Sequence, residues 1–185
     1  MNHETYPELQ ECEFYPDKEG FILGLLKGIE IKSILDVGAG HGGVFAYGYW
    51  DGRTDMEKRE ACDLFFCRPM SPRWTSKVGV DARKLTDFYP AKSFDLVQCM
   101  ETLEHMHNPI KAVEQMLFVA RKAVVITSAC IAHHIGPAQE ESEKWNPHLK
   151  YIAQPKVKGL LDLGMEVRVA NQTEQSQLIA WKILT

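Results

Sequence analysis

The sequence predicts an α/β fold in which helices cover both faces of a mostly parallel β-sheet. Short apolar runs alternate with helical segments along the 185 residues, and this alternation is typical of parallel strands joined by helices. A first apolar run at residues 34–37 leads directly into a turn with four glycines among residues 38–43. The last two apolar runs flank the polar residues 172–175, which indicates an antiparallel hairpin.

Most elements follow from the spacing of apolar residues. Asn108 and Pro109 mark the start of one helix, because asparagine caps free N–H groups and proline fits the first helical position. Pro69 and Pro72 exclude regular structure around them. In chain order we expect a helix at residues 21–26, a strand at 33–37, a helix at 44–50, strands at 61–67, 77–80 and 93–100, a helix from 109, a strand at 123–127, a helix at 155–163, and hairpin strands at 165–169 and 177–184.

The composition is that of an ordinary globular domain with one core. The formal net charge is −4 and no block of Lys or Arg occurs, so a large nucleic-acid-binding surface is not expected. The five cysteines include no C-x-x-C pair, which predicts reduced thiols and a cytoplasmic location. Residues 1–10 are polar, unlike a signal peptide, and no apolar run has the length of a membrane-spanning helix.

The glycine-rich turn is the strongest functional signal. Gly38, Gly40 and Gly43 fit the G-x-G-x-x-G fingerprint of dinucleotide-binding folds, whereas Asp36 begins a D-x-G-x-G-x-G pattern that includes Gly42. A carboxylate before the turn repels a pyrophosphate but is compatible with a positively charged sulfonium. The stretch therefore resembles the first motif of class I S-adenosylmethionine (SAM)-dependent methyltransferases. The resemblance implies that SAM is contacted by Asp36, Gly38, Ala39, Gly40 and Gly42.

The resemblance also implies an acidic residue at the end of the next strand, which holds the ribose hydroxyls of SAM. Asp81 directly follows an apolar run and is the first choice, together with its neighbour Ala82. Asp63 lies closer to the spacing of about twenty residues found in dinucleotide folds, and is the second choice. Asp81 also resembles the acid that contacts the adenine amino group in this family. The moiety that each aspartate contacts therefore stays open.

Residues 93–100 resemble the fourth motif of the family, a buried strand whose carboxyl end, at Met100, lies at the cofactor site. Glu101, Glu104 and His105 follow as an E-x-x-E-H pattern, which resembles the metal motif of metal-dependent O-methyltransferases. In those enzymes a later histidine completes the site, and His148 has the matching position. The four residues predict a site for Mg²⁺, Mn²⁺ or Zn²⁺. In the alternative, Glu104 and His105 only pack locally, as in metal-free members of the family.

Methyl transfer to a hydroxyl group requires a group that takes the hydroxyl proton, and histidine is the usual one. His105 and His148 are candidates for this catalytic role. The adjacent pair His133 and His134 is a further candidate, because it follows the strand at 123–127 in the segment that covers the acceptor in this family.

The resemblance thus implies a SAM-dependent methyltransferase with a Rossmann-like sheet of the seven-stranded type. We expect it to O-methylate a small molecule or a glycan, with an amine as the other acceptor class. One methyltransferase domain is expected over residues 31–185, after an N-terminal segment, residues 1–30, whose helix lies over the cofactor site. Two alternatives stay open. A nucleotide-binding oxidoreductase would need a catalytic Tyr–Lys or His pair that is not visible, and a SAM-fold binding protein would lack catalysis.

Overall fold

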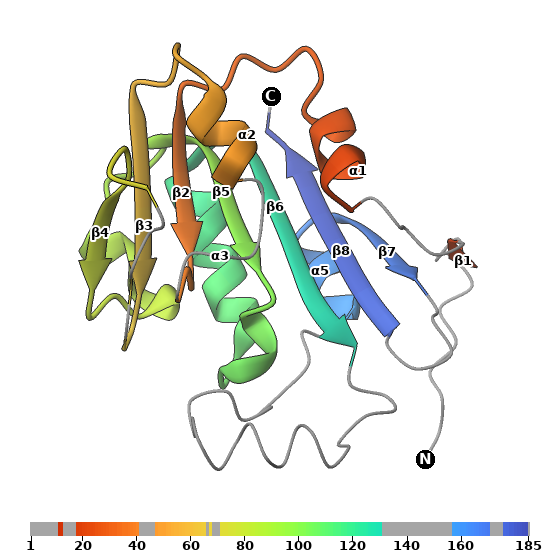
Figure 1. The fold of residues 1–185 in the computed structure, drawn as a ribbon. Helices are drawn as coiled ribbons and strands as arrows, with labels where there is room; N and C mark the ends of the chain where they lie inside the picture. The colour runs from red at the N-terminus through yellow and green to blue at the C-terminus, as the bar shows by residue number, and fades with distance from the viewer. Residues whose placement is uncertain are drawn as a thin grey trace, which may run out of the picture.

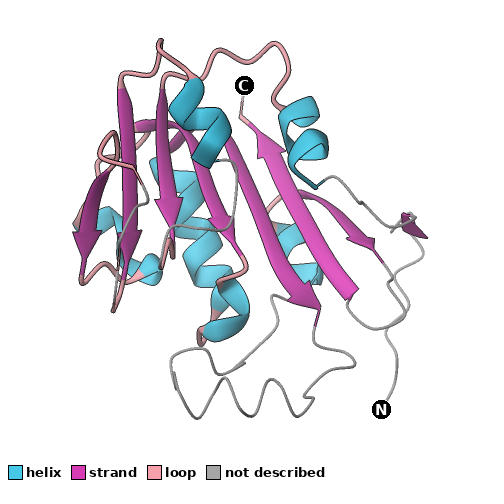
Figure 2. Cartoon of the chain, viewed as in Figure 1, coloured by secondary structure: helices cyan, strands magenta, loops and turns pink. Residues whose placement is uncertain are grey.

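The computed structural model describes residues 11–12, 18–40, 47–65, 67, 71–130, 157–170 and 176–184, which form one sheet flanked by helices (Figure 1 and Figure 2). The strands are β1 (Glu11–Cys12), β2 (Ser33–Val37), β3 (Lys58–Asp63), β4 (Thr75–Val78), β5 (Phe94–Met100), β6 (Ala120–Cys130), β7 (Glu166–Ala170) and β8 (Ser176–Ile183). The helices are α1 (Lys18–Leu25), α2 (Tyr47–Gly52), α3 (Pro109–Val119) and α5 (Val157–Asp162), with two 3₁₀ helices, η1 (Ala82–Asp87) and η2 (Leu103–His105).

The eight strands of the described sheet have the order β1-β7-β8-β6-β5-β2-β3-β4. Neighbouring strands pair in parallel, except that β8 runs antiparallel to both β6 and β7. The predicted α/β class, with its parallel strands and its closing antiparallel hairpin, is confirmed. The arrowheads of β2, β3, β5 and β6 lie at the same edge of the sheet in Figure 1. Ligands of open α/β sheets bind at this carboxyl edge.

Two apolar cores lie on opposite faces of the sheet. On the face that α1 and α2 cover, Ile22 and Trp50 belong to one cluster with Ile34 of β2. On the other face, Val113 of α3 and Leu160 of α5 belong to a second cluster with alternate residues of β5 and β6. All seven residues of β5 are buried, as expected for a central parallel strand that is covered on both sides.

A buried carboxylate fixes the amino end of β5. Asp95 is 1% exposed and accepts hydrogen bonds from the backbone N–H of Lys32 at 2.9 Å and from Nε of Arg121 at 2.8 Å. Its own backbone N–H donates to Oγ of Ser33 at 2.8 Å. Burial raises the pKa of Asp95, but the hydrogen bonds from Lys32 and Arg121 outweigh burial and hold the pKa below its ordinary value. Through its carboxylate and its backbone N–H, Asp95 of β5 therefore connects to the start of β2 and to β6.

The strand after α2 differs from the sequence prediction. The apolar run predicted a strand at 61–67, whereas β3 spans Lys58–Asp63. Residues Lys58 to Cys62 of β3, of which the first three are polar, pair with β2 along its full length. Glu60 also accepts the hydroxyl of Tyr89 at 2.7 Å and forms an ion pair with Lys58 at 3.2 Å. Pairing with a neighbour, rather than local hydrophobicity, therefore sets the bounds of this strand, and Asp63 is its last residue.

Other boundaries agree more closely with the prediction. β2 spans the predicted residues, and α3 begins at Pro109, where the Asn108 side chain accepts from the backbone N–H of Lys111 at 3.3 Å. α2 ends at Gly52, two residues beyond the predicted helix at 44–50, and β4 begins before the predicted strand at 77–80. In the part of the chain that the structure describes, no helix has the length and apolar character needed to cross a membrane.

Candidate active site

A tight turn follows β2 at the carboxyl edge of the sheet. Gly38 and Gly40 have φ angles of 75° and 49°, a left-handed conformation that glycine adopts without the cost that a Cβ atom brings. The backbone N–H groups of Gly38 and Ala39 both donate to the carbonyl of Cys62, at 2.8 and 3.1 Å. The turn is therefore fixed to the end of β3. Gly42 lies outside the described residues.

Asp63 brings a carboxylate to this turn. It is the last residue of β3, and its Oδ2 accepts a hydrogen bond from the backbone N–H of Gly40 at 3.2 Å. Its Oδ1 accepts from the backbone N–H of Phe65 at 2.9 Å. Leu64 and Phe65, which follow, are 40% and 58% exposed. An acidic group beside exposed apolar side chains suits a ligand that carries hydroxyl groups next to a flat apolar ring.

Asp81 has a different environment. It caps the amino end of η1, where Oδ1 accepts from the backbone N–H of Arg83 at 2.9 Å. Its carboxylate also accepts from Nε and Nη2 of Arg83, at 2.9 and 2.7 Å. The Arg83 side chain holds the pKa of Asp81 below its ordinary value. These three hydrogen bonds tie the Asp81 carboxylate to Arg83 of its own helix, η1. The neighbouring Ala82 is buried in the core on the α3 face.

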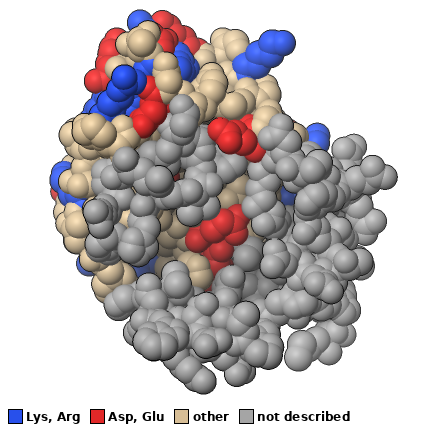
Figure 3. Space-filling view, viewed as in Figure 1, with Lys and Arg blue, Asp and Glu red and all other residues tan. Residues whose placement is uncertain are grey.

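Asp36 and Asp63 lie on the same face of the sheet. Asp36 is 5% exposed and is in register with Ala61 of β3 and Gln98 of β5. Asp63 follows Ala61 by two residues, so its side chain is on the face of Asp36, which is also the face of α1 and α2. Figure 3 views this side and shows acidic side chains near the middle, with visible Lys and Arg side chains mainly toward the rim. The arrangement favours a ligand with positive charge.

The carboxyl end of β5 lies beside the same turn. Met100, its last residue, is 7% exposed, and its Sδ accepts from the hydroxyl of Thr127 at 3.5 Å. Glu101 has a left-handed φ of 50°, and its backbone N–H donates to the carbonyl of Thr127 at 2.9 Å. The hydroxyl of Thr102 is 3.1 Å from the carbonyl oxygen of Gly38. Segments from β2, β3 and β5 therefore meet at this one place.

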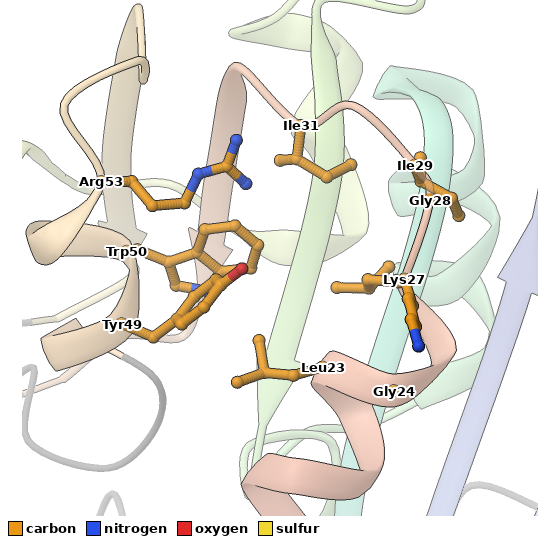
Figure 4. A pocket seen from close by; sticks show the side chains of 10 residues that line it. Leu23, Gly24, Lys27, Gly28, Ile29, Ile31, Tyr49, Trp50 and Arg53 are labelled. Carbon is orange, nitrogen blue, oxygen red and sulfur yellow. The ribbon is translucent and has the colours of Figure 1, made fainter.

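A separate cavity of about 430 Å³ lies between α1, the loop that follows it, and α2. Figure 4 shows Leu23 and Ile31 on one side of it, and Tyr49 and Trp50 of α2 with Arg53, the residue after α2, on the other. Its lining includes no residue of the glycine turn and none of the predicted site residues. The sequence analysis did not predict this cavity.

The family assignment follows from comparison with known proteins. Residues 12–164 match a family model described as a methyltransferase domain. The chain belongs to this family. It is a class I SAM-dependent methyltransferase, as the first and fourth motifs predicted, and the alternative of an oxidoreductase is dropped. No curated protein matches the chain.

Solved structures with the same fold include several methyltransferases. A SAM-dependent methyltransferase from Aquifex aeolicus has a TM-score of 0.54 and 20% identity, over 90% of this chain and 93% of that one. One from Archaeoglobus fulgidus has a TM-score of 0.58 and 15% identity, over 88% and 90% of the two chains. Phosphoethanolamine N-methyltransferase 2 of Haemonchus contortus, in complex with SAM, has a TM-score of 0.62 and 14% identity; the match covers 90% of this chain and 52% of that one. At such identities the likeness shows the fold.

The predicted metal centre of the methyltransferase is not supported. Among the described residues, no group of three or more His, Cys, Asp and Glu side chains is arranged to hold a metal ion, so Glu101, Glu104 and His105 do not form such a group. The side chains of Glu101 and Glu104 would converge on one ion if the two residues lay on one continuous helical turn. Instead, Glu101 is left-handed, Thr102 has a φ of −131°, and η2 begins only at Leu103. These residues therefore do not fit a metal ion.

Glu104 has a packing role in the methyltransferase. Its side chain is 1% exposed, and it accepts a hydrogen bond from the hydroxyl of Ser128 at 3.0 Å. This contact matches the alternative in which the glutamate packs locally. His105 is half-buried in η2. The other predicted histidines, His133, His134 and His148, lie outside the described residues.

The contact of Thr102 with the turn was not predicted from the sequence, and neither was the position of Asp63 at the end of a strand. A strand that ended after Ala61 and Cys62 would have placed Asp63 at its carboxyl end, and this was the signal in the sequence for Asp63. No local signal singled out Thr102, because its partner Gly38 is 64 residues away.

Proposed function

We propose that this methyltransferase transfers the methyl group of SAM to a hydroxyl group of a small molecule or a glycan. The observation that carries the cofactor site is the hydrogen bond from the backbone N–H of Gly40 to the carboxylate of Asp63. It joins the glycine turn to an acid at the end of the adjacent strand. His105 supports a hydroxyl acceptor, because it follows β5 at the same edge of the sheet and an imidazole can take a hydroxyl proton.

The residues at the glycine turn fit SAM. A carboxylate is an acceptor of hydroxyl hydrogens, and the bonds from Gly40 and Phe65 hold the Asp63 carboxylate beside the turn. We therefore assign the ribose hydroxyls to Asp63, and the exposed Leu64 to the adenine ring. Asp36 on the same face adds negative charge that favours the sulfonium. Asp81 is left with the adenine amino group as its proposed partner.

When bound, SAM supplies an electrophilic methyl group. The chain must then hold the acceptor oxygen in line with this group and take its proton, and alignment alone accounts for much of the acceleration in such reactions. We propose that the imidazole of His105 takes the proton, because His105 is only half-buried and lies next to Glu104, which Ser128 holds in place. His133, His134 and His148 are the further candidates for this role.

The test combines calorimetry with an assay of product formation. The purified chain is titrated with SAM and with S-adenosylhomocysteine. It is then incubated with SAM and one acceptor at a time, either a hydroxyl compound (a phenol or a sugar) or an amine of similar structure. We expect binding of both cofactor forms and release of S-adenosylhomocysteine only with hydroxyl acceptors. His105→Gln should lower kcat by about 100-fold or more without loss of SAM affinity. His107→Gln is the matched control, because His107 is exposed and lies two residues further along.

Each part of the proposal has its own contradicting result. A folded chain that binds neither cofactor form overturns the cofactor site. Turnover with amines but not with hydroxyl acceptors overturns the acceptor class. Tight SAM binding without release of S-adenosylhomocysteine for any acceptor favours the non-catalytic alternative. Full activity of His105→Gln removes His105 as the base.

A further inference from the structure

The side chain of Thr102 connects the end of β5 to the glycine turn. Its hydroxyl lies 3.1 Å from the carbonyl oxygen of Gly38 and 3.0 Å from that of Met100. A hydroxyl has one hydrogen to donate, so the two carbonyls share it. The contact with Gly38 spans 64 residues of sequence and joins two neighbouring parallel strands beyond the last residue of each.

The shape of Thr102 also matches the turn. A Cβ atom added to Gly38 would lie 2.1 Å from the Thr102 methyl carbon and 2.6 Å from its hydroxyl oxygen. Gly38 also has a positive φ of 75°. The Thr102 side chain therefore occupies the space that any other residue at position 38 would need. Both the packing and the positive φ therefore require glycine here.

An unusual backbone directs Thr102 to this place. Glu101 adopts a left-handed φ of 50°, which costs a non-glycine residue free energy and persists only where its surroundings hold it. The backbone N–H of Glu101 donates to the carbonyl of Thr127 on β6 at 2.9 Å. The Thr102 hydroxyl provides the other contact, toward β2. The strained residue is thus held from both neighbouring strands.

The glycine turn is likewise held from two sides. On the side of β3, the carbonyl of Cys62 and the carboxylate of Asp63 accept from Gly38, Ala39 and Gly40. On the side of β5, Thr102 donates to the carbonyl of Gly38. Among these contacts, the Thr102 hydroxyl is the one that a single side-chain substitution removes without changing a charge.

We propose that Thr102 is a positioning residue that holds the glycine turn in the conformation that binds the cofactor, and thereby sets the affinity for SAM. The inference rests on the proposed cofactor site. Thr102 acts through Gly38 rather than by contact with the reacting atoms. It also links the turn to η2, so the segment with His105 and the cofactor turn share one anchor.

The test uses three variants of the full chain. Thr102→Val keeps the branched shape and removes the hydroxyl, whereas Thr102→Ser keeps the hydroxyl and removes the methyl group. Thr86→Val is the matched control, because the Thr86 hydroxyl bonds to Gln115 at an exposed site, at 2.8 Å. We expect Thr102→Val to weaken SAM binding by about 2- to 12-fold, the range for one lost hydrogen bond of ordinary strength. Thr102→Ser should keep most of the affinity, and Thr86→Val all of it.

A second measurement is independent of the cofactor. Amide hydrogen exchange of the free protein, read on peptides that contain residues 38–40, should be faster by a similar factor in Thr102→Val but unchanged in Thr102→Ser and Thr86→Val. Wild-type exchange in Thr102→Val overturns the inference whether or not the chain binds SAM. Faster exchange with wild-type SAM affinity also overturns it. Failure of the wild-type chain itself to bind SAM is the distinct result that overturns the proposed cofactor site.

Discussion

The carboxylate of Asp63 accepts a hydrogen bond from the backbone N–H of Gly40 across 23 residues of sequence, at 3.2 Å. The two residues belong to the ends of adjacent parallel strands, which pair from Ser33 with Lys58 to Val37 with Cys62. The pairing of β2 with β3 therefore brings the acid at the end of β3 next to the turn that follows β2.

Asp63→Asn should weaken SAM binding by about 10- to 100-fold, because a charged acceptor contributes about 1.5–3 kcal/mol to a hydrogen bond that it forms. Asp81→Asn is the comparison. Its carboxylate already accepts three hydrogen bonds from Arg83, so we expect a smaller loss of affinity. Calorimetric titration of both variants with SAM checks the order. A larger loss in Asp81→Asn would restore the choice made from sequence.

Gly40→Ala should reduce both the free energy of unfolding and the affinity for SAM. An added Cβ at Gly40 meets no atom of the described residues within 4 Å, so the effect comes from its φ of 49°, which costs an L-residue about 1–2 kcal/mol. Gly24→Ala is matched, since Gly24 also has no atom within 4 Å of an added Cβ but lies in α1 without a positive φ. We expect Gly24→Ala to raise stability by up to about 1 kcal/mol. Urea unfolding gives the free energy of unfolding of both variants. Since neither added Cβ meets a described atom, the difference between them measures the cost of the positive φ at Gly40, and equal stabilities would contradict that cost.

Asp95→Asn should destabilise the fold by about 1.5–3 kcal/mol, because a buried charged acceptor loses its charge-assisted bonds to Lys32 and Arg121. The pKa of Asp95 in the folded state is lower than in the unfolded state. Its contribution is therefore fully present above the unfolded-state pKa of about 3.9 and is lost as the pH falls through the folded-state value. Urea unfolding from pH 7 down to pH 3 should show this loss in the wild type and a smaller one in Asp95→Asn. Parallel pH profiles would rule out the contribution.

Methyltransferase activity should persist in EDTA, because Glu101, Glu104 and His105 do not form a group that holds a metal and Glu104 is engaged with Ser128. The assay compares turnover in EDTA with turnover after addition of Mg²⁺ or Mn²⁺, and elemental analysis of the purified chain accompanies it. Activity that falls in EDTA and returns with the metal ion would show that the ligands include residues that the structure does not describe, such as His148.

The sequence predicted a helix or strand boundary correctly where residues at the boundary itself, such as a capping residue or a glycine, determine it. Asn108 and Pro109 set the start of α3, and the glycine turn set the end of β2. β3 was misplaced because its first residues are polar and become a strand only by pairing with β2. That error placed Asp63 inside a predicted strand instead of at its end, and so Asp63 was only the second choice for the acid at a strand end. The E-x-x-E-H pattern misled for a related reason, since spacing along a sequence gives side-chain direction only where the backbone is regular, and Glu101 interrupts it.

The position of β8 has a consequence for the order in which the sheet is assembled. β7 leaves the ribosome before β8, yet its partners are β8 and β1, and it does not pair with β6. Until β8 inserts, β6 has an unpaired edge and the pair of β1 and β7 has no connection to the remaining strands. Trp181 of β8 also belongs to the core on the face of α1 and α2. Any partly folded form that lacks β8 therefore exposes the backbone N–H and C=O groups along the edge of β6, and such an unpaired edge can pair with a strand of another chain.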